Sequence, residues 1–243
     1  MKIELHEKPQ KPIIIEGFPG VGLVGTIATE FLIDHLKAKQ IGTIWSDKLP
    51  PLTAIHDNKV VQPLGVFYDS KHNLVILHAI SGVQGLEWEV ADEILKISEE
   101  LKAYEILSLE SVGVMQQPEE GKPEEKSKCF FHSNKVDSNE KLSKTEAEPL
   151  KEGIIMGVTG ALLLKTKIRH TCLFAETHSQ MPDSKAAAAL IEVLKKYLGL
   201  EIDTKPLIES AKQFEEKLKG ILEQGMAAKE EKKTNDEKLS YLG

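Results

Sequence analysis

Residues 12–36 read PIIIEGFPGVGLVGTIATEFLIDHL, and this stretch decides the fold. It opens with an apolar, β-branched run from Pro12 to Glu16, which is typical of a buried strand. A glycine-rich turn follows, and apolar residues then recur at i, i+3, i+4 and i+7 from Val24 to Leu36, which predicts an amphipathic helix. A strand, a tight turn and a helix in this order predict an α/β unit.

The alternation of short apolar runs and helical periods continues to about residue 200, so we predict an α/β fold with a central, mostly parallel or mixed sheet flanked by helices. Several strands lack polar alternation, which indicates burial on both faces. Further helices are predicted at Leu86–Leu101 and at Ser184–Leu198, the second between an Asp183 N-cap and Gly199. The predicted strands are Lys2–His6, Pro12–Glu16, Gly42–Trp45, Val60–Tyr68, Leu74–Ile80, Glu105–Val112, Lys128–His132 and Thr171–Glu176.

The pattern changes twice along the chain. From Gln116 to Glu148 it is polar and rich in lysine and glutamate, which predicts an exposed, mobile loop. From Pro206 apolar residues follow heptad spacing, so we divide the chain into an α/β domain at 1–204 and a C-terminal helix with a flexible polar tail at 205–243. The helix either joins subunits or packs on its own domain. Its apolar stripe is Leu207, Ala211, Phe214, Leu218 and Ile221.

Composition excludes several function classes. The chain has 243 residues and a net charge of −7, so it offers no basic surface for nucleic acid or an anionic membrane. Its longest apolar stretch, Gly153–Leu164, is too short to span a bilayer, and its start lacks a secretory apolar region. Cys129 and Cys172 lack the spacing of a zinc site or disulfide framework. We expect a cytoplasmic protein with no metal, nucleic-acid partner or membrane partner.

The glycine turn allows two interpretations. Gly20, Gly22 and Gly25 satisfy GxGxxG, with Asp47 at the distance where an acidic residue contacts a ribose, which is typical of a dinucleotide-binding turn. The same glycines also allow a helix to pack tightly against a strand. A Walker phosphate loop is excluded, because Thr26 stands where its lysine is required.

Three glutamates stand at the predicted carboxyl ends of strands, where parallel strands meet in one crevice: Glu16, Glu110 and Glu176. They could form a carboxylate cluster for metal binding or acid–base chemistry. Alternatively, each caps a turn or faces solvent, which is the reading that the residues alone favour.

Other candidate catalytic groups are few. His78 lies within a strand and is interpreted as a core histidine, while His170 and Cys172 share a strand face at i and i+2, too few ligands for a metal site. The sequence contains no Ser/His/Asp elbow, HExxH motif or CxxC pair. We therefore predict a protein that is not an enzyme and needs no cofactor.

Four blocks in this order carry a resemblance: EGFPGVGLVG at 16–25, SDKLPPLTAIHDNKVVQP at 46–63, SGVQGLEWEVADEIL at 81–95 and GVTGALLL at 157–164. Together they resemble the archaeal branch of the proteasome assembly chaperone family, homologues of proteasome assembly chaperone 2. The resemblance covers about residues 10–200. Its motif turn comprises Gly17, Phe18, Pro19, Gly20, Gly22 and Gly25.

The resemblance implies a fold like that of nucleoside phosphorylases and related hydrolases, used without catalysis. It also implies a homo-oligomer that binds 20S proteasome α subunits as an assembly chaperone or adaptor, in some members through a terminal hydrophobic-tyrosine-any-residue motif. Here Tyr241, Leu242 and Gly243 end the chain, with tyrosine third from last instead of penultimate. Because some members are labelled ATP-dependent ligases, the alternative is a nucleotide-dependent enzyme, ligase-like or dinucleotide-binding, that uses Gly20, Gly22 and Gly25.

Overall fold

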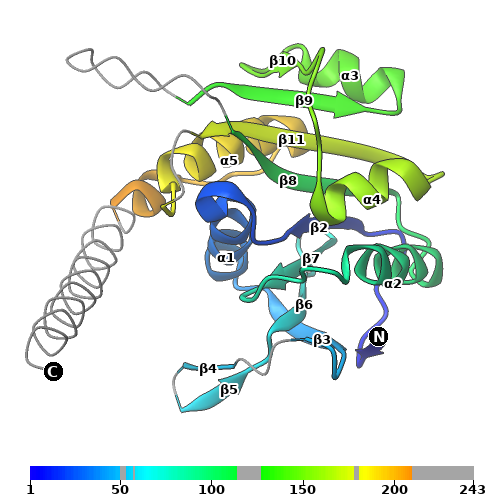
Figure 1. Ribbon diagram of the computed structural model, residues 1–243. Helices are drawn as coiled ribbons and strands as arrows, with labels where there is room; N and C mark the ends of the chain where they lie inside the picture. The colour runs from blue at the N-terminus through cyan, green and yellow to red at the C-terminus, as the bar shows by residue number, and fades with distance from the viewer. Residues whose placement is uncertain (50–52, 57, 114–126, 178–180, 210–243) are drawn as a thin grey trace, which may run out of the picture. The chain divides into compact units, whose positions relative to one another are not determined.

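The computed structural model describes residues 1–49, 53–56, 58–113, 127–177 and 181–209 (Figure 1). Met1–Thr204 forms one compact unit, and Lys205–Gly243 is a second unit of which Lys205–Glu209 is described. A nine-stranded sheet with helices on both faces builds the first unit. The predicted α/β fold with a central sheet is therefore confirmed.

The sheet is mixed, with the strand order β1-β3-β6-β7-β2-β8-β11-β9-β10. Its four central strands, β7, β2, β8 and β11, run parallel, while β6, β3 and β1 extend one side with antiparallel pairs. On the other side β9 is antiparallel to β11, and β10 is parallel to β9. The strands are β1 Lys2–Leu5, β2 Ile13–Gly17, β3 Lys39–Trp45, β6 Leu64–Asp69, β7 Leu74–Ala79, β8 Glu105–Gly113, β9 Cys129–Ser133, β10 Glu148–Pro149 and β11 Arg169–Thr177, and a separate hairpin pairs β4 Ala54–His56 with β5 Lys59–Val61.

Helices cover both faces of this sheet (Figure 1). α1 and α5 pack side by side against one face, α2 and α4 pack side by side against the other, and α3 lies beside β9. Within the described residues, no helix combines the length and apolar character that crossing a bilayer requires. The helices are η1 Val21–Leu23, α1 Val24–Leu36, α2 Glu87–Glu100, α3 Val136–Leu142, α4 Gly157–Lys165 and α5 Ser184–Leu198.

Burial of the central strands on both faces explains their missing polar alternation. Ile14 and Ile15 are neighbours in β2 whose side chains point to opposite faces, yet both are fully buried. Ile14 belongs to the apolar cluster that contains Ile94 of α2 and Leu162 of α4. Two covered faces leave no solvent-facing position in the middle of the strand.

Glycine at two positions brings α1 directly onto the central strands. A Cβ atom at Gly17, the last residue of β2, would lie 2.3 Å from the carbonyl oxygen of Gly25 in α1. A Cβ atom at Gly25 would lie 2.3 Å from the carbonyl oxygen of Leu109 in β8. Such contacts are far inside van der Waals distance and involve backbone atoms that cannot rotate away. The packing interpretation of the glycine turn is therefore supported at both positions.

The predicted bounds of α5 are confirmed by its end groups. The Asp183 carboxylate accepts a hydrogen bond from the backbone N–H of Ala186 at 2.9 Å, which satisfies one free donor of the first turn. Gly199 adopts the left-handed conformation at φ 71° and ends the helix. A strong N-cap and a terminal glycine thus made this helix the clearest to predict.

Two element predictions were wrong. The stretch Val60–Tyr68 was predicted as one strand, but it contains the end of β5 and most of β6, which belong to different sheets. The predicted strand Lys128–His132 is confirmed by β9, but the predicted loop 116–148 also contains α3 and the first residue of β10, while 114–126 lies outside the described residues. The helix α3 was not predicted because only two of its residues, Ser138 and Leu142, are buried. Two buried positions are too few to produce a helical pattern of apolar residues.

We expect Gly25→Ala to lower the free energy of unfolding by about 1–3 kcal/mol, because the new methyl group must displace α1 from β8. Urea denaturation followed by circular dichroism measures this loss. The matched control is Gly82→Ala, where a Cβ meets no atom within 4 Å, and its effect should stay below about 0.5 kcal/mol. Equal stability of the two variants would contradict the close contact.

Candidate functional site

Glu16, Glu110 and Glu176 lie at the carboxyl ends of three parallel strands, β2, β8 and β11, as predicted. β8 pairs with both other strands, so the three strand ends are adjacent in the sheet. The three glutamate side chains differ in how deeply they are buried. Glu16 is fully buried, so the expectation that each glutamate faces solvent or caps a turn is wrong for this residue.

A threonine of α4 joins two of these carboxyl groups. The Thr159 hydroxyl lies 3.1 Å from Oε1 of Glu16 and 3.4 Å from Oε2 of Glu110, and its single proton is donated to one of them at a time. The backbone N–H of Ser111 donates to Oε1 of Glu110 at 3.0 Å. Oε2 of Glu16 has no hydrogen-bond partner among the described residues. Glu16, Thr159 and Glu110 therefore form one buried polar cluster between the sheet and α4.

Burial sets the protonation of this cluster. The pKa of Glu16 is raised to about 8, mainly by removal from water and in smaller part by the nearby Glu110 carboxyl, while the hydroxyl groups of Ser108 and Thr159 oppose the rise. Burial raises the pKa of Glu110 to about 7. At neutral pH Glu16 is accordingly a neutral carboxylic acid.

An open cleft of about 950 Å³ lies beside the cluster, and Glu110 and Glu176 both line it. Its walls are the glycine turn at 18–21, the corner at 82–87, the end of β8 at 110–113 and the segment 148–158, which leads into α4. One of the described residues that line it is Ser111, whose hydroxyl donates a hydrogen bond to the carbonyl oxygen of Val21 at 2.7 Å. The described part of that lining includes no histidine or cysteine.

The glycine turn meets this cleft through Phe18, Pro19 and Gly20. A Cβ atom at Gly20 would lie 2.6 Å from Oε1 of Glu110, so glycine here makes room for a carboxyl group. An acidic side chain against the turn opposes the binding of a pyrophosphate. The geometry therefore favours the packing interpretation over the dinucleotide interpretation.

The histidines singled out from the sequence are buried. Nδ1 of His78 lies 2.9 Å from the Thr29 hydroxyl of α1, in agreement with its interpretation as a core residue. Nε2 of His170 lies 2.8 Å from the Ser108 hydroxyl and 3.4 Å from Sγ of Cys172. Burial lowers the pKa of each imidazole to about 4, so both are neutral at physiological pH.

The thiols and carboxylates of the described residues form no group of three ligands suited to a metal ion. Cys129 and Cys172 are both free and buried. Burial raises the pKa of the Cys129 thiol to about 12, and it also raises the pKa of Cys172. Both side chains thus remain protonated core thiols.

The comparisons with known proteins agree over almost the whole chain. The model of the PAC2 family matches residues 14–222. This chain belongs to the PAC2 family. Among solved structures it is similar to Pyrococcus furiosus PbaA, described as an archaeal homolog of proteasome-assembly chaperone, with 31% identity, a TM-score of 0.80 and coverage of 94% of this chain and 100% of that one.

Two further relatives extend this pattern. Pyrococcus furiosus PbaB, described as an archaeal proteasome activator, shares 29% identity at a TM-score of 0.73 and covers 90% of this chain and 98% of its own. The uncharacterized protein MJ0106 of Methanocaldococcus jannaschii is 33% identical over 221 residues, or 88% of this chain and 87% of the relative. The resemblance to archaeal members of the family is therefore confirmed.

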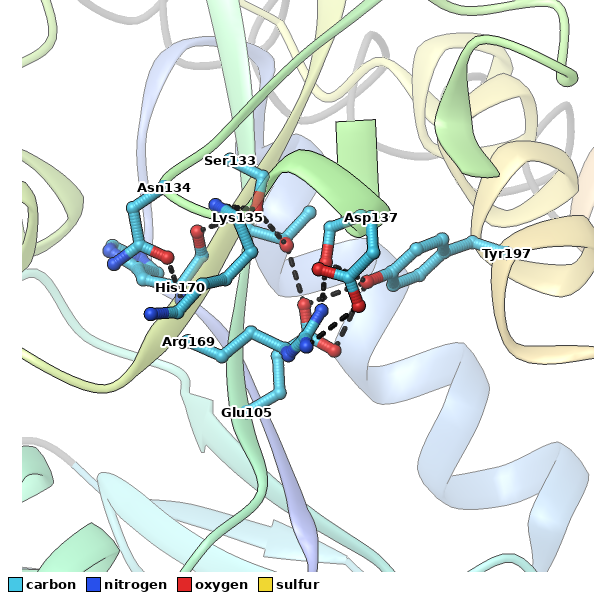
Figure 2. A network of polar contacts seen from close by, with 10 residues as sticks. Glu105, Ser133, Asn134, Lys135, Asp137, Arg169, His170 and Tyr197 are labelled. Carbon is cyan, nitrogen blue, oxygen red and sulfur yellow. Dashed lines mark hydrogen bonds and ion pairs between the residues drawn. The ribbon is translucent and has the colours of Figure 1, made fainter. Parts of the chain in front are cut away.

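A second polar network of this PAC2 family member was not predicted, and it lies at the opposite ends of the parallel strands (Figure 2). Glu105, the first residue of β8, accepts hydrogen bonds from Tyr197 of α5 at 2.8 Å and from the Thr171 hydroxyl at 2.5 Å. Arg169, which begins β11, pairs with Asp137 of α3 at 2.8 Å. The network fastens α3 and α5 to the sheet, which indicates a structural role.

Several predicted site residues lie outside the described residues. These are four of the five residues of the heptad stripe and the three residues at the end of the chain. Leu207 alone represents the stripe within the described part. The residues in question are Ala211, Phe214, Leu218, Ile221, Tyr241, Leu242 and Gly243. Their roles stay predictions.

We expect the pH dependence of stability to reveal the buried proton. Because the pKa of Glu16 rises from 4.5 to about 8 on folding, the folded state holds a proton that the unfolded state releases between these values. Its stabilisation is present below pH 4.5 and is lost as the pH rises through 8, with a limiting slope of about 1.4 kcal/mol per pH unit. Glu16→Gln should remove this contribution and leave that of Glu110, whose pKa is raised to about 7, and urea denaturation across pH 5–9 measures the difference.

The variant Glu99→Gln, at an exposed position of α2, provides the control and should keep the wild-type slope. The two buried histidines have the opposite effect on the free energy of unfolding. Because the pKa values of His78 and His170 are lowered from 6.5 to about 4, their contribution to stability is lost as the pH falls through this range. The slope of Glu16→Gln should therefore differ from wild type only above about pH 4.5. Parallel wild-type and Glu16→Gln profiles would show that Glu16 is ionised in the folded protein.

Proposed function

We propose that this PAC2 family member is a non-catalytic, homo-oligomeric protein of the cytoplasm that binds 20S proteasome α subunits as an assembly chaperone or adaptor. The observation that carries the proposal is the similarity to PbaA, with a TM-score of 0.80 over 94% of this chain and 100% of PbaA. The similarity to PbaB, described as an archaeal proteasome activator, supports a role linked to the same particle.

The state of the polar groups supports a role without catalysis. Glu16 is buried and protonated at neutral pH, and the neutral His170 imidazole is enclosed between Ser108 and Cys172. A general base or nucleophile must reach a substrate, whereas these groups are bonded inside the fold. The paired groups are better explained as parts of the core.

The proposed contact with the proteasome lies in the last three residues, Tyr241, Leu242 and Gly243. They combine an aromatic ring and an apolar side chain, and a polar stretch at 229–238 precedes them. Such a stretch acts as a tether, and an oligomer presents several copies of the same end. Weak individual contacts then add up, because each bound copy raises the effective concentration of the next.

Deletion of residues 241–243 should abolish binding to the cognate 20S proteasome or its free α subunits. Pull-down and size-exclusion chromatography of the full-length and shortened proteins measure this loss. Ser240→Ala is the matched control, because it changes the same end without touching the proposed anchor, and it should bind like wild type. Tyr241→Ala should reproduce the loss and so identify the ring as the anchor.

Binding that survives the deletion would contradict the tail contact and assign the interaction to the α/β unit. Failure of the full-length protein to bind the particle or its α subunits would overturn the proposed function. It would favour the alternative of a nucleotide-dependent enzyme, for which isothermal titration with ATP and NAD is the direct assay.

We further propose that the heptad stripe of Leu207, Ala211, Phe214, Leu218 and Ile221 joins the subunits. Deletion of residues 206–243 should then lower the native mass, because an apolar stripe loses its partner stripe on a second copy. Light scattering coupled to size-exclusion chromatography measures this mass. Deletion of 229–243 keeps the stripe and is the control. An unchanged mass after the longer deletion would refute the role of the helix in assembly.

A further inference from the structure

The cleft beside Glu110 is a feature of the fold that the proposed function does not use. Its volume of about 950 Å³ lies at the upper end of the range for small-molecule sites. Its walls come from six separate segments of the α/β unit, so the fold itself shapes it. A space of this size accommodates several side chains of a peptide.

The wall formed by 148–158 carries apolar side chains in contact with solvent. Ile154 is 90% exposed and Met156 is 77% exposed, and both stand just before α4. Val21 on the glycine turn is 45% exposed and lines the same cleft. Large apolar side chains gathered around one hollow mark a surface that is covered by another molecule.

The charge of the cleft indicates the chemistry of the molecule that covers it. Among its described lining residues the acidic side chains are Glu87, Glu110, Glu148, Glu152 and Glu176, whereas the only basic one is Lys151. Within the part of the chain that the structure describes, no salt bridge neutralises Glu87, Glu148, Glu152 or Glu176. A hollow lined by one sign of charge attracts the opposite charge.

We propose that this cleft binds an apolar, lysine-bearing peptide segment of a partner protein. The segment places its apolar side chains against Ile154, Met156 and Val21, and its ammonium groups beside Glu148 and Glu152. Lysine suits such a site because its long apolar stem packs on the wall while its charged end reaches the carboxylates. Phosphates and other anions are repelled by the same carboxylates.

The charge of the whole chain favours a different protein over a second copy as the occupant. Each copy carries a net charge of −7, which has the same sign as the charge of the cleft. Like-charge contacts at an interface suppress association. A partner with exposed lysine residues next to apolar ones is complementary to the cleft in charge and in apolar character.

Glycine residues in the walls allow the cleft to be filled without a clash. A Cβ atom at Gly82 or at Gly113 would meet no atom within 4 Å, and both residues line the cleft. Neither residue has a positive φ angle. The Gly82→Phe variant should therefore fold normally while occupying the space that a peptide side chain would take.

The test measures fluorescence anisotropy of a labelled, capped short peptide that alternates lysine and leucine, mixed with the full-length protein. We expect saturable binding that weakens as the salt concentration rises. Gly82→Phe and the double variant Glu148→Lys, Glu152→Lys should each weaken it by about tenfold or more. Peptides with glutamate for lysine, or with serine for leucine, should bind far more weakly.

The matched control is the double variant Glu99→Lys, Glu140→Lys, which makes the same change of net charge at exposed positions outside the cleft. Its affinity for the peptide should stay within about twofold of wild type. Circular dichroism and urea denaturation show whether each variant is folded. Equal weakening by both double variants would overturn the proposal, because binding would then follow net charge alone.

Two other outcomes also overturn it. If the peptide does not bind the wild-type protein, the cleft does not select this chemistry. If Gly82→Phe leaves peptide binding unchanged but lowers the native mass, the cleft joins copies of this chain instead. The proposal does not depend on proteasome binding, because the peptide assay needs no proteasome and its variants leave residues 241–243 intact.

Discussion

The contact of α1 with the backbone of β2 and β8 is the constraint on which the rest of the fold depends. It exists because Gly17 and Gly25 carry no side chain where the main chains meet. With α1 held this close, Thr29 reaches His78 in β7 and the glycine turn ends beside Glu110 of β8. One face of the parallel sheet is thereby closed tightly, and the cleft lies at the carboxyl ends of its strands, where the glycine turn lines it.

A buried carboxylic acid is the second consequence of this closure. Glu16 follows three isoleucines in β2 and is enclosed with them, and the nearby carboxyl of Glu110 makes ionisation still less favourable. Burial of a charge without a cation is costly, so the proton is retained. Thr159 supplies the one hydroxyl that both glutamates share, which links α4 to the two central strands. The cluster is therefore better explained by a structural role, which is to hold α4 against β2 and β8, than by the role of a catalytic dyad.

The sequence predicted elements whose signals are local and missed contacts that the fold creates. α5 was predicted to the residue because Asp183 and Gly199 mark its ends, and β2 and α1 were evident from the apolar run and its change of period. The strand-end position of Glu16 and Glu110 also followed from sequence, but Thr159 did not, because a threonine in the first turn of a helix carries no signal of its partner. The same applies to Glu105 and Tyr197, which are far apart in sequence and meet only when α5 packs on β8. A glutamate at the head of an apolar strand was the only hint of that network.

The two cysteines have a practical consequence. Both thiols are enclosed by the sheet and its helices, and burial holds the pKa of Cys129 at about 12. Alkylating reagents react with the thiolate, so the native protein is a poor target for them, whereas the unfolded chain exposes two ordinary thiols. The rate of alkylation thus reports how often the sheet opens, residue by residue, without any added label. Cys172 in the central β11 reports opening of the middle of the sheet, and Cys129 in β9 reports opening nearer its edge.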